Sequence, residues 1–278
     1  MNAIEIKNLS KKYKDFELDN INLCLPSGYI MGLVGENGAG KSTLIRLIMD
    51  IITRDSGSVT VLGKDNRDRF EITKQDIGVV LDNVGYYDNF TGKIISKIMR
   101  NIYKNWDDEL FFEYLERFDV PADKKFSKLS KGMKMKMSIA VALSHNAKLL
   151  IFDEATNGLD PVIRDDILNI LSEFTRDENH SVLISSHITA DLEKICDYFA
   201  FLRKGRLVLC EEKDRLLENY GIIHCTAEAL SEIEPKAIIG KKESEYGIEA
   251  MIERSYAPKD ISVSPIDIEQ LFVYMMRG

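Results

Sequence analysis

The sequence predicts an α/β fold with a parallel sheet, a helical subdomain inserted into it and a small C-terminal extension. Lys148–Phe152 reads as an apolar strand, as expected of a strand buried on both faces of a parallel sheet. From there to about residue 210, strand and helix patterns alternate, which is typical of β/α units. Apolar residues within residues 91–145 recur instead at the helical period, so this block is expected to interrupt the α/β frame.

The first 62 residues are expected to form strands and one helix. In chain order these are strands at Ala3–Leu9 and Phe16–Leu25 (around an Asp-Asn turn), a strand at Tyr29–Val34, a helix at Ser42–Ile52 and a strand at Ser58–Leu62. Turns are indicated at Pro26-Ser27-Gly28 and Asp55-Ser56-Gly57. The Gly-rich segment between the third strand and the helix therefore belongs to a strand–loop–helix unit.

Three helices are expected in the inserted block. Thr91 is a suitable N-cap for the first, and Asp107–Phe118 forms the second, which stops before Pro121. Ser130 is a suitable N-cap for the third, at Lys131–Ser144. The helical subdomain is therefore placed at about residues 88–145.

The second half of the chain is expected to complete the α/β unit. Its elements are a strand at Lys148–Phe152, a helix at Pro161–Thr175, a strand at Ser181–Ser185, a helix at Thr189–Cys196 and strands near Tyr198–Leu202 and Leu207–Cys210. The rest is a mixed tail whose last element, Ile266–Met276, has the periodicity of a helix. We therefore expect one domain at residues 1–210 and an extension at residues 211–278, whose role (inhibition, dimerisation or packing alone) stays open.

Composition excludes some functions. The formal net charge is −8 and the chain has no basic tail, so no nucleic-acid partner is expected. The four cysteines form no CxxC pair and the four histidines are dispersed, which favours free thiols in a reducing compartment and argues against a structural zinc site. The N-terminus lacks a signal-peptide core, and no apolar run approaches the roughly 20 residues that span a bilayer. A membrane partner, if there is one, is expected to be another polypeptide.

A Gly-rich loop carries the strongest chemical signal. It matches the pattern GxxxxGK[ST] with Gly35, Glu36, Asn37, Gly38, Ala39, Gly40, Lys41, Ser42 and Thr43. Glycines let the backbone wrap phosphates, so that successive N–H groups and a helix N-terminus point at negative charge. Lys41 is expected to reach the β- and γ-phosphates, and the Ser42 hydroxyl to join a Mg²⁺ shell. The loop predicts a P-loop NTPase that binds ATP.

Two acids follow the strand at residues 148–152. Asp153 and Glu154 are expected at the carboxyl end of that buried strand, where ligands bind in open α/β sheets. Asp153 suits the Mg²⁺ shell through water, and Glu154 suits the role of polarising the attacking water. With the phosphate loop, this pair indicates nucleotide hydrolysis.

A third motif narrows the class. Leu129-Ser130-Lys131-Gly132-Met133 opens a predicted helix between the two phosphate motifs and resembles the signature LSGGQ of ABC-transporter ATPases. The resemblance covers about residues 3–210. It implies a RecA-like core with an antiparallel β subdomain and an inserted helical signature subdomain. It also implies that Ser130 and Gly132 close over the ATP held by the phosphate loop of a second subunit, whereas the fragment alone reads as an ordinary N-cap.

Three further sites come from the same resemblance. Tyr13 falls where the family stacks an aromatic ring on adenine, although it also reads as a strand-edge tyrosine. Asn157-Gly158-Leu159-Asp160 resembles the D-loop, which passes between subunits. His187 matches the switch histidine that contacts the γ-phosphate and holds the water.

Two departures from the family pattern stand out. Asp82 occupies the position of the Q-loop glutamine, so it either acts through a water or binds Mg²⁺ directly, with Asn83 as a possible substitute. In the signature, Lys131 replaces the first glycine and Met133 the glutamine. ATP is still expected to be sandwiched, with fewer polar contacts to the ribose.

The resemblance implies an ATP-binding and hydrolysing subunit of an ABC transporter at the cytoplasmic face of the cell membrane. It is expected to work as a head-to-tail dimer, with an identical or a homologous second ATPase subunit and an ABC-2-type transmembrane permease. Two segments, Ile266–Leu271 and the stretch that ends at Asp82, resemble the corresponding segments in ATPases of exporters of peptides and drugs, including phenol-soluble-modulin exporters. Alternatives are a soluble ABC ATPase or a low-turnover nucleotide-dependent regulator. Ribosome-acting members normally carry two cassettes, and DNA-repair members a long coiled coil that residues 41–130 lack.

Overall fold

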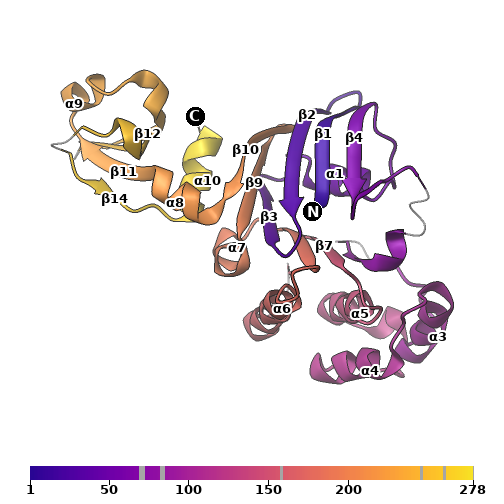
Figure 1. Cartoon of the computed structure of the whole chain (residues 1–278). Coiled ribbons are helices and arrows are strands. Elements are labelled where there is room, and N and C mark those ends of the chain that lie inside the picture. Colours follow the sequence, from indigo (N-terminus) through magenta and orange to yellow (C-terminus); the bar gives the residue numbers. More distant parts are fainter. Residues whose placement is uncertain (69–72, 82–84, 157–158, 245–246, 259–260, 278) are drawn as a thin grey trace.

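The computed structural model describes residues 1–68, 73–81, 85–156, 159–244, 247–258 and 261–277. The described strands form three sheets, and a group of helices lies beside the central one (Figure 1). Within these ranges no helix is both long enough and apolar enough to cross a bilayer.

The described N-terminal part contains strands, helix α1 and a short 3-10 helix. Its elements are β1 (Asn2–Lys12), β2 (Glu17–Pro26), β3 (Ile30–Gly35), α1 (Lys41–Ile48), β4 (Ser56–Val61), β5 (Lys64–Asp65), η1 (Lys74–Asp76) and β6 (Ile77–Val80). The inserted helices are α3 (Gly92–Ile102), α4 (Asp108–Arg117), η2 (Phe126–Lys128) and α5 (Lys131–Leu143). The core is completed by β7 (Leu149–Asp153), α6 (Pro161–Phe174), β8 (Ser181–Ser185), α7 (Thr189–Ile195), β9 (Tyr198–Arg203) and β10 (Arg206–Glu212).

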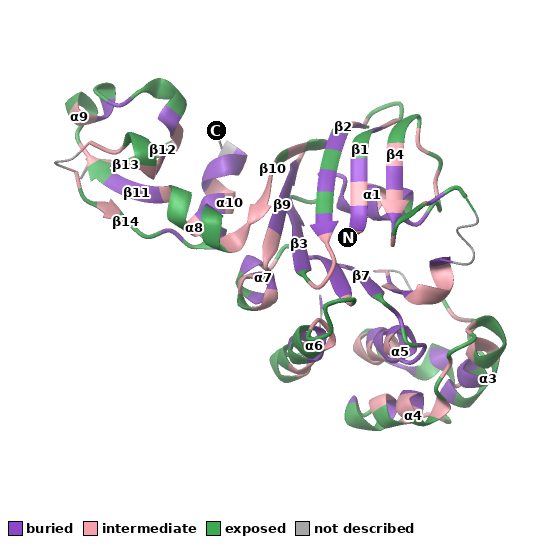
Figure 2. Cartoon of the chain, viewed as in Figure 1, coloured by how far each residue is buried: buried purple, intermediate pink, exposed green. Residues whose placement is uncertain are grey.

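The central sheet has the strand order β10-β9-β3-β8-β7-β6. All neighbours pair in parallel except β10 with β9. Successive residues of a strand face opposite sides, so Leu150 and Phe152 of β7 join one apolar core while Leu149 and Ile151 join another. Both faces are buried (Figure 2), and this explains why these strands read as continuous apolar runs.

An antiparallel sheet, in the order β2-β1-β4-β5, forms the second layer. Its apolar residues share one core with α1 and one face of the central sheet. The predicted Asp-Asn turn is wrong, because β2 runs unbroken from Glu17 to Pro26. Asn20 instead has a φ of 50°, and the register against β1 shifts there. The strand absorbs the polar pair as an irregularity rather than a reversal.

Two of the inserted helices begin at the predicted caps, Thr91 and Ser130, and the third is capped by Asp107, which was expected to be its first residue. The side-chain oxygens of Thr91, Asp107 and Ser130 accept from the backbone N–H groups of residues 94, 110 and 133, respectively. Each cap satisfies one N–H that the first turn leaves without an intrahelical partner. Helix α1 is shorter than predicted, since the chain turns at Asp50, whose φ is 48°. A left-handed residue just past a helix is a common way to end it.

The C-terminal extension forms a third sheet, in the order β12-β13-β11-β14. Its elements are α8 (Lys213–Asn219), β11 (Tyr220–Cys225), α9 (Ala227–Ser231), η3 (Pro235–Ala237), β12 (Ile238–Ser244), β13 (Gly247–Glu253), η4 (Arg254–Tyr256), β14 (Val263–Ser264) and α10 (Ile268–Arg277). The final helix lies between this sheet and the core (Figure 1), and the Phe272 ring packs 5.7 Å from that of Phe201 in β9. The expected boundary at residue 210 falls within β10.

A buried histidine joins the helical block to the central sheet. His145 follows α5 and is 1% exposed. Its Nδ1 lies 3.1 Å from the Val141 carbonyl oxygen and its Nε2 lies 3.2 Å from that of Ile77 in β6. Its ring stacks 3.9 Å from that of Tyr103. Burial lowers the pKa of His145 below its ordinary value, although the two carbonyl contacts oppose this shift.

We expect His145 to contribute to acid destabilisation. As pH falls below about 6.5, the unfolded chain takes up a proton that the folded imidazole excludes, so the free energy of unfolding decreases. In His145→Gln, the loss of Tm between pH 7.5 and pH 5.5 should therefore be smaller than in the wild type. His224→Gln is the control because His224 is exposed. An unchanged pH dependence in His145→Gln would contradict this assignment.

Candidate functional site

The phosphate loop lies between β3 and α1, and two of its glycines are required by geometry. Gly38 has a φ of +80° and a Cβ added there would meet nothing within 4 Å. Gly40 has a φ of +112°, and a Cβ there would lie 2.8 Å from Cζ of Phe16. Residues other than glycine rarely adopt such φ values. The loop can therefore bring backbone N–H groups close to an anion at the N-terminus of α1.

Lys41, the first residue of α1, is buried at the base of this loop. Its Nζ donates to the Gly35 carbonyl at 2.7 Å and to the Glu36 carbonyl at 3.4 Å. The same Nζ lies 3.1 Å from Oε1 of Glu154, and the lysine side chain is 6% exposed. A cation removed from water needs this charged partner. The pair brings together the two phosphate motifs that the sequence separates by more than a hundred residues.

The two acids lie at the carboxyl end of β7, as predicted. Asp153 is 4% exposed and its Oδ1 accepts from Ser185 Oγ at 2.8 Å. Ser185 Oγ in turn accepts from the backbone N–H of Glu154 at 3.0 Å. Parallel pairing places Asp153 opposite Ser185 in the sheet. The serine thus holds both the Asp153 carboxylate and the start of the Glu154 turn, a role that the sequence did not reveal.

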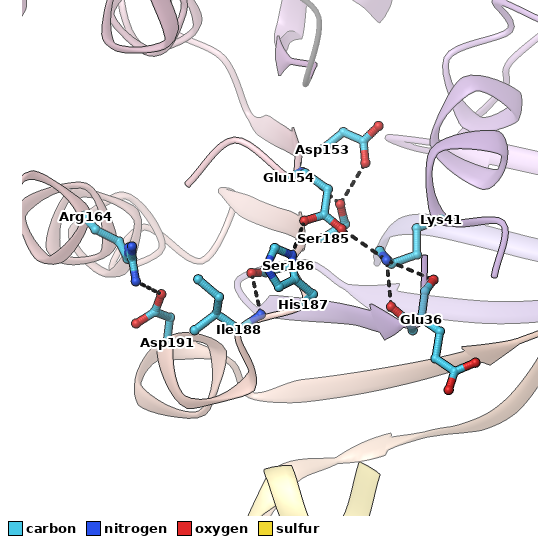
Figure 3. Close-up of polar contacts among 11 residues, drawn as sticks. Glu36, Lys41, Asp153, Glu154, Arg164, Ser185, Ser186, His187, Ile188 and Asp191 are labelled. Carbon is cyan, nitrogen blue, oxygen red and sulfur yellow. Dashed lines mark hydrogen bonds and ion pairs between the residues drawn. The ribbon is translucent and has the colours of Figure 1, made fainter. Parts of the chain in front are cut away.

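His187 completes the arrangement from the loop after β8. Its Nδ1 lies 3.0 Å from Oε2 of Glu154. Lys41 and His187 therefore hold the two oxygens of one carboxylate (Figure 3). The backbone of Glu154 has a φ of 53°, a left-handed conformation that is uncommon for a residue with a side chain. The turn aims the Glu154 carboxylate back toward the phosphate loop.

A cavity of about 630 Å³ opens over these groups. Its lining consists of Phe16, Glu36, Asn37, Gly38, Gly40, Lys41, Ser42, Thr43, Glu154 and His187. This volume is within the range of small-molecule sites. Except for Phe16, all of these residues come from the predicted phosphate loop, from the end of β7 or from the loop after β8. The sequence signals were therefore sufficient to find the polar part of the site.

The aromatic side of the cavity differs from the expectation. Phe16, which precedes β2, lines it, whereas Tyr13 is not among the lining residues. Tyr13 is 43% exposed, and Nζ of Lys11 lies 5.5 Å from its ring centre. Adenine stacking by Tyr13 stays a prediction. The sequence signal for Phe16 was that it is a second aromatic residue, three positions after Tyr13.

The signature residues lie away from this cavity. Ser130 and Gly132 are at the N-terminus of α5, where Ser130 Oγ accepts from the Met133 N–H at 3.2 Å. Asp160 caps α6 and accepts from the Ile163 N–H at 3.1 Å. None of the three lines the cavity. Asp82, Asn83, Asn157 and Gly158 lie outside the described residues.

The site suits a phosphate group and a small divalent cation. Loop N–H groups and Lys41 supply positive charge, while the Ser42 hydroxyl and the Asp153 carboxylate are oxygen groups that could act as cation ligands. No group of three acidic, histidine or cysteine ligands occurs in the part of the chain that the structure describes. A cation bound to Ser42 and Asp153 could complete its shell with phosphate oxygens and water. This is the usual coordination of Mg²⁺ in nucleotide sites.

Comparisons with known proteins agree with this geometry. The model of the family described as "ABC transporter" matches residues 18–157. The chain is 33% identical over 218 residues to the ABC transporter ATP-binding protein YtrB of Bacillus subtilis (strain 168), covering 78% of this chain and 74% of that protein. The bacitracin transport ATP-binding protein BcrA of Enterococcus faecalis is 33% identical over 213 residues, covering 74% of this chain and 68% of that protein.

Two further matches point the same way. The lantibiotic transport ATP-binding protein SrtF of Streptococcus pyogenes is 32% identical over 214 residues, covering 76% of this chain and 91% of that protein. A solved ATP-binding subunit of an ABC transporter superposes with a TM-score of 0.70 at 26% identity, covering 77% of this chain and 91% of that one. Sequence and fold therefore agree over the region that contains the cavity.

Ser185 provides a test of the site geometry. Ser185→Ala removes one donor to Asp153 and one acceptor for the Glu154 N–H, so we expect unfolding to become easier by about 1–3 kcal/mol. Turnover of ATP should fall because Glu154 loses its fixed direction. Ser181→Ala is the matched control: Ser181 is also buried in β8, but its Oγ binds Gly28 at 3.0 Å and lies at the other end of the strand. Equal turnover losses in both variants, measured as kcat, would contradict the assignment.

Proposed function

Because this chain belongs to the ABC transporter family and is an ATP-binding, ATP-hydrolysing subunit, we propose that it drives a bacterial exporter of peptides or other amphipathic compounds. The observation that carries the catalytic part is the carboxylate of Glu154 between Lys41 and His187. These three groups can bind a terminal phosphate and direct a water at it.

The contacts of Glu154 indicate how the site becomes active. Lys41 now neutralises Glu154, and the phosphate loop presents further positive charge beside it. A γ-phosphate carries more charge than one carboxylate and competes for Lys41. Once released from that pair, Glu154 can accept a hydrogen bond from the attacking water, with His187 holding the other oxygen. Lys41 and the loop N–H groups then stabilise the charge that develops on the phosphate.

Mg²⁺ fits the oxygen ligands at the same place. When bound, it would neutralise charge on the β- and γ-phosphates. Ser42 and Asp153 are the residues that would hold it, with Asp153 fixed by its bond to Ser185. Asp82 is a further candidate ligand from the sequence.

A second ATPase subunit is part of the proposal. Ser130 and Gly132 lie at an exposed helix N-terminus rather than in this chain's own cavity. A helix N-terminus favours an anion, so the α5 terminus of one subunit can close over the phosphates bound by the other. Asp160 and the residues before it would lie between the two subunits. Full catalysis then requires a head-to-tail pair, with identical or homologous subunits.

The transport assignment rests on relatives. Two of them are ATP-binding proteins for bacitracin and lantibiotic transport, and both compounds are peptides. We therefore assign to this chain an ABC-2-type permease as partner, a peripheral place at the cytoplasmic face of the membrane and an amphipathic cargo. In this proposal the permease forms the translocation path.

Glu154→Gln tests the hydrolytic role. The amide keeps the shape of the side chain but cannot polarise water as a carboxylate does, so we expect ATP binding with turnover reduced by at least about a hundredfold. Trapped ATP should also make dimers accumulate in size-exclusion chromatography. Glu36→Gln is the control, because Glu36 lines the same cavity while its carboxylate points away from Lys41 (Figure 3). Near-normal turnover by Glu154→Gln would rule out this mechanism.

The transport partner can be tested separately. Full-length chain carrying an affinity tag, purified from mild-detergent extracts of its own cells, should bring down a polytopic membrane protein. Deletion of the coding sequence should increase sensitivity to bacitracin or a lantibiotic, and Glu154→Gln should not restore resistance. Copurification of ribosomes without a membrane protein would instead support a soluble role.

A further inference from the structure

A second charged pair lies beside the site, between the first turns of α6 and α7. Arg164 Nη1 lies 3.4 Å from Oδ2 of Asp191, and Nη2 donates to the Leu159 carbonyl at 3.1 Å. One guanidinium therefore contacts both Leu159, just before α6, and Asp191, in the first turn of α7; Figure 3 shows the contact with Asp191. The catalytic groups described above do not use this pair.

Stability alone does not explain the pair. The side chains of Arg164 and Asp191 are only 23% and 13% exposed, and replacing a buried ion pair by apolar residues is often neutral or stabilising. Within the described residues, the buried Nε of Arg164 has no hydrogen-bond partner, which is costly. A cation in the first turn of a helix is also unfavourable for the helix dipole. The contacts of Arg164 therefore point to another role.

The two ends of the pair are close in sequence to functional segments. Leu159 and Asp160 immediately precede α6 and belong to the segment expected between the two subunits. Asp191 is the third residue of α7, four positions after His187. Only three residues separate His187 from Asp191. The backbone around His187 is also constrained, since Ser186 Oγ accepts from the Ile188 N–H at 3.0 Å. A displacement of Leu159 can therefore reach His187 through Arg164 and the first turn of α7.

We propose that Arg164 and Asp191 are a positioning pair that sets the orientation of His187 according to the position of the segment at Leu159 and Asp160. This inference rests on the proposed function, because it makes hydrolysis depend on the approach of the second subunit. When a partner presses on that segment, the guanidinium moves with the Leu159 carbonyl and carries α7 along. In the closed dimer this movement fixes the orientation of His187, which already contacts Glu154, relative to the attacking water.

Steady-state ATP hydrolysis by the full chain tests the pair. Arg164→Met keeps the length of the side chain without its charge, and we expect kcat to fall roughly tenfold or more because small misplacements of catalytic groups are costly. The KM for ATP should change by less than about twofold, since Lys41 and the phosphate loop are untouched. Asp191→Asn should give a similar loss. The double variant should be no worse than either single one, as expected for residues that act as a unit.

The chain offers a matched control between the same two helices. Lys194 Nζ lies 3.5 Å from Oδ1 of Asp165, but both side chains are about 60% exposed. Lys194→Met and Asp165→Asn should leave kcat within about twofold. Arg164→Lys keeps a cation opposite Asp191 and should have a higher kcat than Arg164→Met. If the pair had a purely structural role, the loss of kcat among the variants would instead parallel their loss of Tm.

Two outcomes separate this inference from the proposed function. The positioning role would be ruled out if Arg164→Met had wild-type turnover, or if the loss of kcat in the double variant equalled the product of the two single losses. Either result would leave the ATPase assignment intact. If the wild type itself hydrolyses ATP no faster than Lys41→Ala, the proposed function fails and the positioning pair fails with it. Should Arg164→Met not fold, Asp191→Asn, which keeps the side-chain shape, gives the same decision.

Discussion

Parallel pairing of β3, β8 and β7 is the constraint on which the site depends. Leu33 of β3 and Asp153 of β7 both pair with Ser185 of β8, so the carboxyl ends of the three strands meet at one edge. The phosphate loop, the two acids and the loop containing His187 leave the sheet at this edge. A one-residue slip would turn every side chain of a strand to the opposite face, which would disrupt the packing of both cores and displace the site residues together. The same packing that stabilises the core therefore fixes the chemistry.

Charge at that edge is balanced without a ligand. The loop amides, the helix N-terminus and Lys41 concentrate positive potential where water is partly excluded, and Glu154 supplies the compensating charge. Asp153 is satisfied separately by Ser185, so the two acids have different environments although they are adjacent. Asp153 is held by the neutral hydroxyl of Ser185, whereas Glu154 is held by Lys41 and His187, which a phosphate can attract. This difference suits a ligand-binding role for Asp153 and a catalytic role for Glu154.

Much of the fold was predictable because each signal was local. Apolar runs gave the buried strands, and Thr91, Asp107 and Ser130 began helices where capping rules place them. The phosphate loop and Glu154 were found from motifs whose chemistry depends on adjacent residues. Ser185, Phe16 and Arg164 escaped notice because their roles come from partners distant in sequence. The individual strands of the C-terminal sheet were not predicted either, since its segments are short and polar on one side.

The ion pair between Lys41 and Glu154 also means that the Glu154 carboxylate competes with a bound phosphate for Lys41. The carboxylate lies 3.1 Å from the ammonium group and belongs to the same chain, so it competes intramolecularly with any free anion for Lys41. Every phosphate compound that enters the cavity must displace it, and weakly charged or poorly positioned anions gain too little to do so. The ion pair thus disfavours the binding of adventitious anions at Lys41. Selectivity here begins with an occupied anion site rather than with the shape of the nucleotide.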